Sequence, residues 1–246
     1  MKMLKSILSA TVCVVLLLGV SSCKESVEKV ELEKTVQLFS GSEAALQMSC
    51  SLDWPLGGYD RNVVRTIQRN IVEAIFPNSD SFNNPEQAFL QWVNETETDY
   101  KECNLADSQE HGESPYMNWE RSVNGKLYQP YNGVVSYVYD HYTYLGGAHG
   151  GTYRGTINMD VNTGRIITAE DIFEAEYHQR LTSLLQEYLP KYADMNMIEN
   201  PSISPSSDFY VTSEGITYIY QQYEIGPYVL GIVEVLIPWS ELTFIK

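Results

Sequence analysis

The sequence predicts an α+β protein, in which antiparallel β-sheets built from consecutive hairpins carry helices packed on one face. Two helical patterns follow one another directly between residues 59 and 105. From residue 116 the apolar pattern changes to a period of two, and tight-turn sequences such as Asn124-Gly125 separate the alternating runs. Helices grouped in sequence, and strands joined by short turns, favour this class over the strand–helix alternation of a parallel sheet.

The first strands are expected at 36–39 and 44–52, where short apolar alternation lies on both sides of a turn at 40–42. The clearest helix covers 59–76, because its apolar residues recur at intervals of three and four. A second helix begins after its N-cap Asn84 and extends to about residue 105.

The remainder of the chain predicts one more helix and several strands. Asn162-Thr163-Gly164 is typical of a hairpin turn, and the Pro- and Ser-rich segment 200–207 is expected to be a loop. The helix is expected at 170–190, and the strands at 117–123, 134–144, 152–161, 165–168, 209–212, 215–222 and 229–237.

The first 23 residues have the layout of a bacterial lipoprotein signal. Lys2 and Lys5 precede an apolar run over 7–20, which is shorter than the ~18 residues of a spanning helix. Small residues then lead to Cys23, which resembles a lipobox cysteine that is diacylated and becomes the new N-terminus. We therefore expect the mature chain to be lipid-anchored to a bacterial membrane in the cell envelope, and, if the cell is Gram-negative, at the outer membrane or the cell surface. An ordinary cleaved signal peptide is the alternative.

Charge limits the possible partners. The chain has 16 Lys and Arg against 32 Asp and Glu, a net charge of −16, which becomes −18 when the signal removes Lys2, Lys5 and no acid. Such a surface repels phosphate backbones, so nucleic acid is not an expected partner, whereas a basic protein or divalent cations would be attracted. Solubility alone is the other explanation of this charge.

Two cysteines, Cys50 and Cys103, remain in the mature chain beside the lipidated one. They either form a disulfide between an early strand and the end of a helix, or stay as two buried free thiols. No Cys or His spacing is typical of a zinc site, so we expect neither a metal nor a cofactor.

A glycine-rich segment is the sharpest candidate for a binding site. Four glycines surround a histidine between two expected strands, and such glycines permit positive φ or a close approach of another chain. A hairpin shaped by glycine with a surface histidine is the alternative. A second candidate follows from Gly226-Pro227, which imposes a turn. The proposed binding residues are Tyr144, Gly146, Gly147, His149 and Gly150 in the first segment, and Tyr223, Glu224 and Tyr228 in the second.

The chain is more consistent with a binding protein than with an enzyme, and no catalytic residue is assigned. Asp140 and His141 point to opposite faces of a regular strand, and no GxSxG, HExxH or Walker sequence is present. The alternative is an enzyme acting on cell-wall glycan with His149 and an acid near Glu224, which requires the two side chains to converge in a cleft.

Several motifs resemble a known family. They are Tyr-Leu-Gly-Gly-Ala-His-Gly at 144–150, Asn-Thr-Gly at 162–164, Glu-Asp-Ile-Phe at 170–173, Tyr-Glu-Ile-Gly-Pro-Tyr at 223–228 and Ile-Pro-Trp-Ser-Glu-Leu at 237–242. Together they resemble the C-terminal module of unknown function of RsiV-type lysozyme-sensing proteins, which also occurs beside PdaC-type peptidoglycan deacetylases. The stretch from about residue 30 to 139 resembles the PdaC-like companion module that precedes it.

The resemblance implies an extracytoplasmic α+β module that binds a ligand, which in RsiV-type proteins is lysozyme. Since only a short segment precedes the apolar signal core and no deacetylase domain follows Lys246, we expect neither an anti-sigma factor nor a deacetylase. The expected function is a non-enzymatic envelope binding protein for lysozyme or peptidoglycan, with a structural envelope lipoprotein as a further alternative. The expected organisation is a signal peptide at 1–22, a lipidated tether at 23–34, a PdaC-like module at 35–139 and an RsiV-like module at 140–246.

Overall fold

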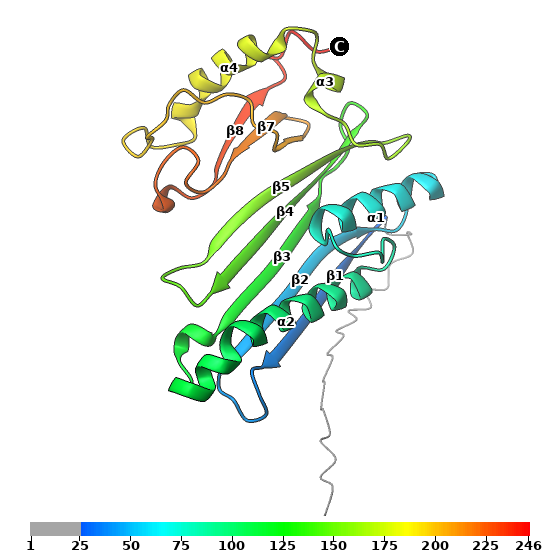
Figure 1. The fold of residues 1–246 in the computed structure, drawn as a ribbon. Helices are drawn as coiled ribbons and strands as arrows, with labels where there is room; N and C mark the ends of the chain where they lie inside the picture. Colours follow the sequence, from blue (N-terminus) through cyan, green and yellow to red (C-terminus); the bar gives the residue numbers. More distant parts are fainter. Residues whose placement is uncertain (1–25) are drawn as a thin grey trace, which may run out of the picture.

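The computed structural model describes residues 26–246, so the expected signal peptide and Cys23 lie outside the described residues. Two sheets make up the fold (Figure 1). The larger has the order β1 (Val27–Gln37), β2 (Ala45–Pro55), β3 (Trp119–Leu127), β4 (Val134–Leu145) and β5 (Gly151–Asp160). The smaller has the order β6 (Phe209–Val211), β7 (Gly215–Tyr220) and β8 (Val233–Pro238). The predicted α+β class is confirmed.

The helices are placed between these strands. The α-helices are α1 (Arg61–Ile75), α2 (Pro85–His111), α3 (Ala169–Ile172) and α4 (Tyr177–Tyr188), and the 3-10 helices are η1 (Pro115–Met117), η2 (Leu189–Lys191) and η3 (Tyr228–Leu230). Asp60 and Asn84 cap α1 and α2 as expected, accepting hydrogen bonds from the backbone of Asn62 at 2.8 Å and Gln87 at 3.0 Å. Within the described range, no helix is both long and apolar enough to cross a membrane.

One pair of strands departs from consecutive hairpins. β2 and β3 pair in parallel, whereas every other pair in the two sheets is antiparallel. The chain between β2 and β3 contains α1 and α2, and a parallel pair needs such a crossover. Both helices lie across one face of the larger sheet (Figure 1).

The two faces of the larger sheet have different roles because neighbouring residues of a strand point to opposite sides. In β4, Tyr137 and Tyr139 pack in the core beneath α1 and α2. Val138 points the other way and packs against Tyr210 and Ile219 of the smaller sheet. The smaller sheet buries its far face against α4, through Leu181 and Leu185 among others. At β4 and β5, the larger sheet is therefore a middle layer, with α1 and α2 on one face and the smaller sheet on the other.

Several boundaries differ from those expected. β1 begins at Val27, so most of the expected tether at 23–34 belongs to the sheet, and the boundary expected at 139/140 falls inside β4. The helix expected at 170–190 is divided into α3 and α4, and the strand expected at 165–168 is reduced to a single bridge at Ile166.

The disulfide considered between Cys50 and Cys103 is not formed, and both thiols are free. Cys50 points from β2 into the core, and burial raises the pKa of its thiol to about 12. Cys103 is exposed on α2, whose buried side carries Tyr100 and Asn104. The expectation that both thiols are buried is therefore also wrong for Cys103, because the helix presents that position to solvent.

Candidate binding surface

The two segments singled out in the sequence meet in the structure. The β4–β5 turn carries His149, and the loop between β7 and η3 carries Tyr223, with Tyr228 at the start of η3. The Tyr228 ring stacks on the His149 ring with centroids 4.0 Å apart, and its hydroxyl donates to the Gly150 carbonyl at 2.9 Å. The Tyr223 hydroxyl lies 3.2 Å from His149 Nε2. We call His149, Tyr223 and Tyr228 the aromatic cluster.

Hydrogen bonds fix the orientation of the histidine ring. Nδ1 of His149 lies 3.0 Å from the carbonyl oxygen of Gly150, which can only accept. Nδ1 therefore donates to this carbonyl, and the Tyr223 hydroxyl lies within hydrogen-bond distance of Nε2 on the other side of the ring. The imidazole is held from both sides, so its outer face is presented in one orientation.

The glycines of the turn serve the backbone in different ways. Gly146 has φ +79°, and a side chain there would overlap the carbonyl of Tyr116. Gly150 is packed against the Tyr142 ring, which leaves no room for a Cβ atom. Gly147 has open space around it. Gly146 and Gly150 are therefore needed to build the turn, and Gly147 is the free position among them.

The second segment is held in a strained shape. Tyr223 has φ +67°, in the left-handed region that residues other than glycine seldom adopt, and 62% of its surface is exposed. Glu224 closes the same turn, since its carboxylate accepts from the backbone N–H of Gln221 at 2.6 Å. In the described chain no hydrogen bond joins Glu224 to His149, so this carboxylate supports the loop instead of contacting the imidazole.

Tyr144 lies at the border of the cluster. It points from β4 to the same face as Tyr142, opposite Glu120 of β3, and is half-buried. Desolvation, followed by nearby acidic groups that include Tyr228 and Tyr144, raises the pKa of Tyr142. The Tyr142 ring packs on Gly150 of the turn, and Tyr144 lies on the same face of β4.

Three exposed apolar side chains belong to the chain segments that build this surface. Leu145 precedes the turn with 51% of its surface exposed, and Val229 follows Tyr228 with 77% exposed. Tyr116, whose carbonyl faces Gly146, is 69% exposed. Leu145 pairs with Trp119 and points to the helix-covered face of the sheet, so Val229 is the exposed apolar side chain next to the aromatic cluster. Exposed aromatic and apolar side chains are typical of interaction sites.

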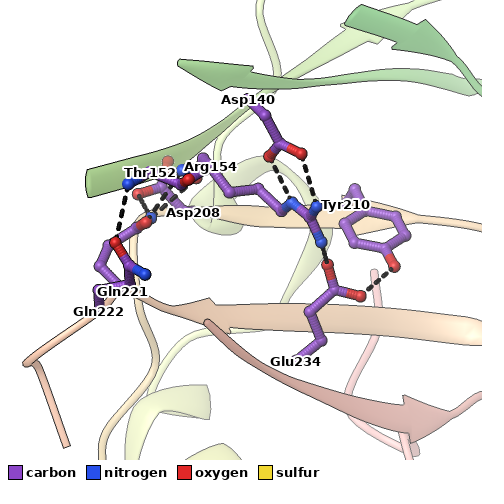
Figure 2. A network of polar contacts seen from close by, with 8 residues as sticks. All are labelled: Asp140, Thr152, Arg154, Asp208, Tyr210, Gln221, Gln222 and Glu234. Atoms are coloured by element: carbon purple, nitrogen blue, oxygen red, sulfur yellow. Dashed lines mark hydrogen bonds and ion pairs between the residues drawn. The ribbon is translucent and has the colours of Figure 1, made fainter. Parts of the chain in front are cut away.

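A polar network fastens the loop that carries Tyr223 to the larger sheet (Figure 2). The side chain of Gln221 accepts from the Arg154 N–H at 3.0 Å and donates to the Arg154 carbonyl at 2.8 Å. The side chain of Gln222 accepts from the Thr152 N–H at 2.7 Å. Sequence analysis did not identify Gln221 or Gln222, and their position directly before Tyr223 was the one available indication.

Arg154 is the centre of this network (Figure 2). Its guanidinium binds both carboxylate oxygens of Asp140, at 2.6 and 2.7 Å, and also pairs with Glu234 of β8. The Tyr210 hydroxyl donates to Glu234 at 3.1 Å. Hydrogen bonds to Asp140 raise the pKa of Arg154 further, so the side chain is a fixed cation that connects the two sheets.

Comparison with protein families divides the chain into two parts. Residues 43–152 match the family model described as "Deacetylase PdaC", and residues 170–240 match "Protein of unknown function (DUF3298)". The chain combines a PdaC-like module with a DUF3298 module. His149 falls within the PdaC match, whereas Tyr223 and Tyr228 fall within the DUF3298 match, so the aromatic cluster is formed by both modules.

Similar proteins agree with this assignment. The chain is 26% identical over 132 residues to the peptidoglycan-N-acetylmuramic acid deacetylase PdaC of Bacillus subtilis (strain 168). The aligned region covers 50% of this chain and 28% of that protein. A DUF3298 family structure from Bacteroides fragilis has a TM-score of 0.77 at 22% identity, covering 89% of this chain and 93% of that one. Another, from Pseudomonas aeruginosa PAO1, has a TM-score of 0.58 at 16% identity, covering 89% and 94%. These structures share the fold of the chain.

Among residues 26–246, no group of three or more His, Cys, Asp or Glu side chains is arranged to hold a metal ion. The candidate surface presents two tyrosine rings and one imidazole, with the exposed Val229 beside them.

Proposed function

We propose that this PdaC/DUF3298 protein is a non-enzymatic, lipid-anchored binding protein of the bacterial cell envelope, and that the aromatic cluster contacts a cationic protein such as lysozyme. The observation that carries the proposal is the convergence of His149 with Tyr223 and Tyr228 on the surface of a strongly acidic chain. Tyrosine provides large contact area with few rotatable bonds, which favours its use in protein interfaces.

The charge of the chain and the shape of the loop support a protein partner. A net charge of −16 accelerates the approach of a basic protein, while the exposed Val229 beside Tyr228 can be buried on contact. Tyr223 keeps a left-handed backbone although glycine would relieve it. Such retained strain is typical of residues whose side chain serves a function.

Peptidoglycan is a second candidate ligand, because the B. subtilis relative is named for an activity on peptidoglycan N-acetylmuramic acid. Exposed tyrosines also stack on sugar rings. An enzyme acting on wall glycan would need a carboxylate beside His149, and the nearest candidate from the sequence, Glu224, is engaged by the backbone of Gln221.

Calorimetry of the full-length protein with a c-type lysozyme tests the proposal. We expect binding that persists at moderate salt, where the screening length is about 8 Å and long-range attraction alone is weak. Ribonuclease A is the control, because it is a basic protein of similar size. Equal binding of both proteins, or loss of lysozyme binding at moderate salt, would contradict the proposal. Sedimentation with insoluble peptidoglycan tests the second ligand.

Substitutions at the aromatic cluster are expected to weaken lysozyme binding without unfolding the protein. Tyr223→Ala and His149→Ala should each make the free energy of binding less favourable by about 1–2 kcal/mol, as for central interface residues. Tyr223→Gly should weaken binding equally but leave stability unchanged or raise it by about 1 kcal/mol, because glycine relieves the left-handed strain.

Tyr192→Ala is the matched control, since Tyr192 is also an exposed tyrosine, 43% exposed, but lies after η2, away from the aromatic cluster. We expect it to leave the affinity unchanged. Wild-type affinity in both Tyr223→Ala and His149→Ala would rule out this surface as the contact site.

A further inference from the structure

A second candidate site lies on the helix-covered face of the larger sheet. A cavity of about 350 Å³ opens beside α2 and the ends of β3, β4 and β5, and is lined by Trp92, Arg121, Tyr139, His141 and Tyr153 among others. His141 faces this cavity, whereas its neighbour Tyr142 faces the aromatic cluster on the other side. We propose that the cavity binds a small ligand through a carboxylate group, with Arg121 as the partner of that carboxylate. This site is separate from the aromatic cluster and does not depend on the function proposed for it.

Arg121 is a half-buried cation without a direct ion-pair partner among residues 26–246, although Asp99 lies near enough to raise its pKa. Its guanidinium lies 5.2 Å from the Trp92 ring centre, and Nη1 donates to the Thr96 hydroxyl at 3.2 Å. Its Nε is buried and has no hydrogen-bond partner. None of the ion pairs within residues 26–246 includes Arg121. In a chain with twice as many acids as bases, this unpaired guanidinium is an unusual arrangement that a ligand carboxylate would complete.

Burial lowers the pKa of both basic side chains of the cavity, Arg121 and His141. Desolvation lowers the pKa of Arg121 more than the nearby Asp99 raises it. Desolvation, followed by the charge of Arg121, lowers the pKa of His141, so the imidazole is neutral at pH 7. Arg121 is therefore the cationic group of the cavity, and His141 offers a neutral hydrogen-bonding ring beside it.

Aromatic rings provide walls for the rest of a ligand. Trp92 and Tyr139 both pack with His141 at nearly right angles, with ring centres 5.9 and 5.7 Å apart. A cavity with apolar walls and few polar groups is the usual form of a small-molecule site, and about 300–1,000 Å³ is the usual size. The geometry therefore provides both a charged anchor and apolar contact area.

Two carboxylates of the cavity limit the class of ligand. Glu95 and Asp99 also line the cavity, and Glu95 accepts from Asn78 at 3.2 Å. These carboxylates repel any anion and a dianion such as a phosphate monoester most strongly, so a ligand carboxylate must bind at the Arg121 guanidinium. They can accept hydrogen bonds from hydroxyl, amide or ammonium groups of the rest of the ligand. The ligand class is thus a singly charged carboxylate whose other end carries hydrogen-bond donors, as in a sugar acid or the free carboxyl end of a peptide.

Matched probes test the carboxylate directly. N-acetylmuramic acid and N-acetylglucosamine share a sugar ring and differ by the lactyl ether that carries the carboxylate, and N-acetyl-alanyl-alanine presents a peptide carboxylate. Titrated into the full-length protein at millimolar concentration, at least one carboxylate probe should bind about tenfold more tightly than N-acetylglucosamine. The probe that binds identifies the sugar or the peptide source. Equal binding of all three probes, or binding of neither carboxylate, would overturn the proposal.

Arg121→Met removes the charge but keeps a side chain that can pack on Trp92. We expect it to weaken binding of the carboxylate probe about tenfold, and Arg69→Met to leave it unchanged. Arg69 is the matched control because its guanidinium also lies over an aromatic ring, at 4.5 Å from Phe82. Lysozyme binding should be the same in both variants, which separates this site from the aromatic cluster.

If Arg121→Met does not fold, the unaltered protein still decides the question. NMR shift changes on adding the carboxylate probe should include the Trp92 indole N–H and the His141 ring. Shift changes confined to other residues would place the ligand elsewhere and overturn the proposal.

Discussion

Arg154→Met should lower the free energy of unfolding by about 2–3 kcal/mol, because it leaves two partly buried carboxylates without their shared cation. Asp140 of β4 and Glu234 of β8 both pair with this guanidinium. Breaking a fully buried pair costs about 3–5 kcal/mol, and the smaller figure reflects the remaining solvent access. The Arg154, Asp140 and Glu234 side chains are 30%, 28% and 31% exposed.

Urea unfolding of the variant measures this effect, and Arg165→Met is the matched control. Arg165 also pairs with a carboxylate, that of Asp171 at 3.0 Å, but its side chain is 61% exposed. Arg165→Met should lower the free energy of unfolding by no more than about 1 kcal/mol, as is usual when an exposed ion pair is lost. Equal losses in the two variants would mean that Arg154 acts as a surface pair and does not fasten the two sheets.

A compensating pair of substitutions identifies the cause of the loss. Adding Asp140→Asn and Glu234→Gln to Arg154→Met removes both unpaired charges, so we expect part of the stability to return. A triple variant as unstable as the single one would attribute the loss to packing of the arginine stem instead.

Local patterns in the sequence predicted the elements and the face that each one buries. The apolar spacing of α1, and its N-cap Asp60, depend on contacts within a few residues, so they are visible in the sequence alone. The parallel pairing of β2 with β3 is not visible in the sequence. Apolar alternation indicates which side of a strand is buried, but not which strand lies beside it. The same limit applies to Cys50 and Cys103, whose distance depends on how α2 is turned over the sheet.

In the candidate site, too, the sequence revealed local features but not contacts between distant segments. Gly146 and the turn at Gly226-Pro227 were visible as local features, but their convergence was not, since His149 and Tyr223 are 74 residues apart. Arg154 and Gln221 were missed because a single arginine or glutamine in a strand has no local signature. Their role appears when β5 and β7 are brought together by the fold.

Gly146→Ala is expected to lower the free energy of unfolding by about 2–3 kcal/mol and to abolish lysozyme binding by moving the β4–β5 turn. Two independent effects add at this position. The backbone has φ +79°, which disfavours alanine, and the new Cβ would overlap the carbonyl of Tyr116. Because that carbonyl belongs to Tyr116 in the middle of η1, neither partner can move without shifting a neighbouring segment.

Gly147→Ala is the matched control, because the next residue of the same turn has open space around it and no positive φ. Thermal unfolding should place this variant within about 0.5 kcal/mol of the unaltered protein. Equal destabilisation by the two variants would contradict the close approach at Gly146. A Gly147→Ala variant that stays fully stable yet loses affinity would show that the ligand itself approaches this glycine. The pair therefore separates a glycine that shapes the turn from one that makes room for a partner.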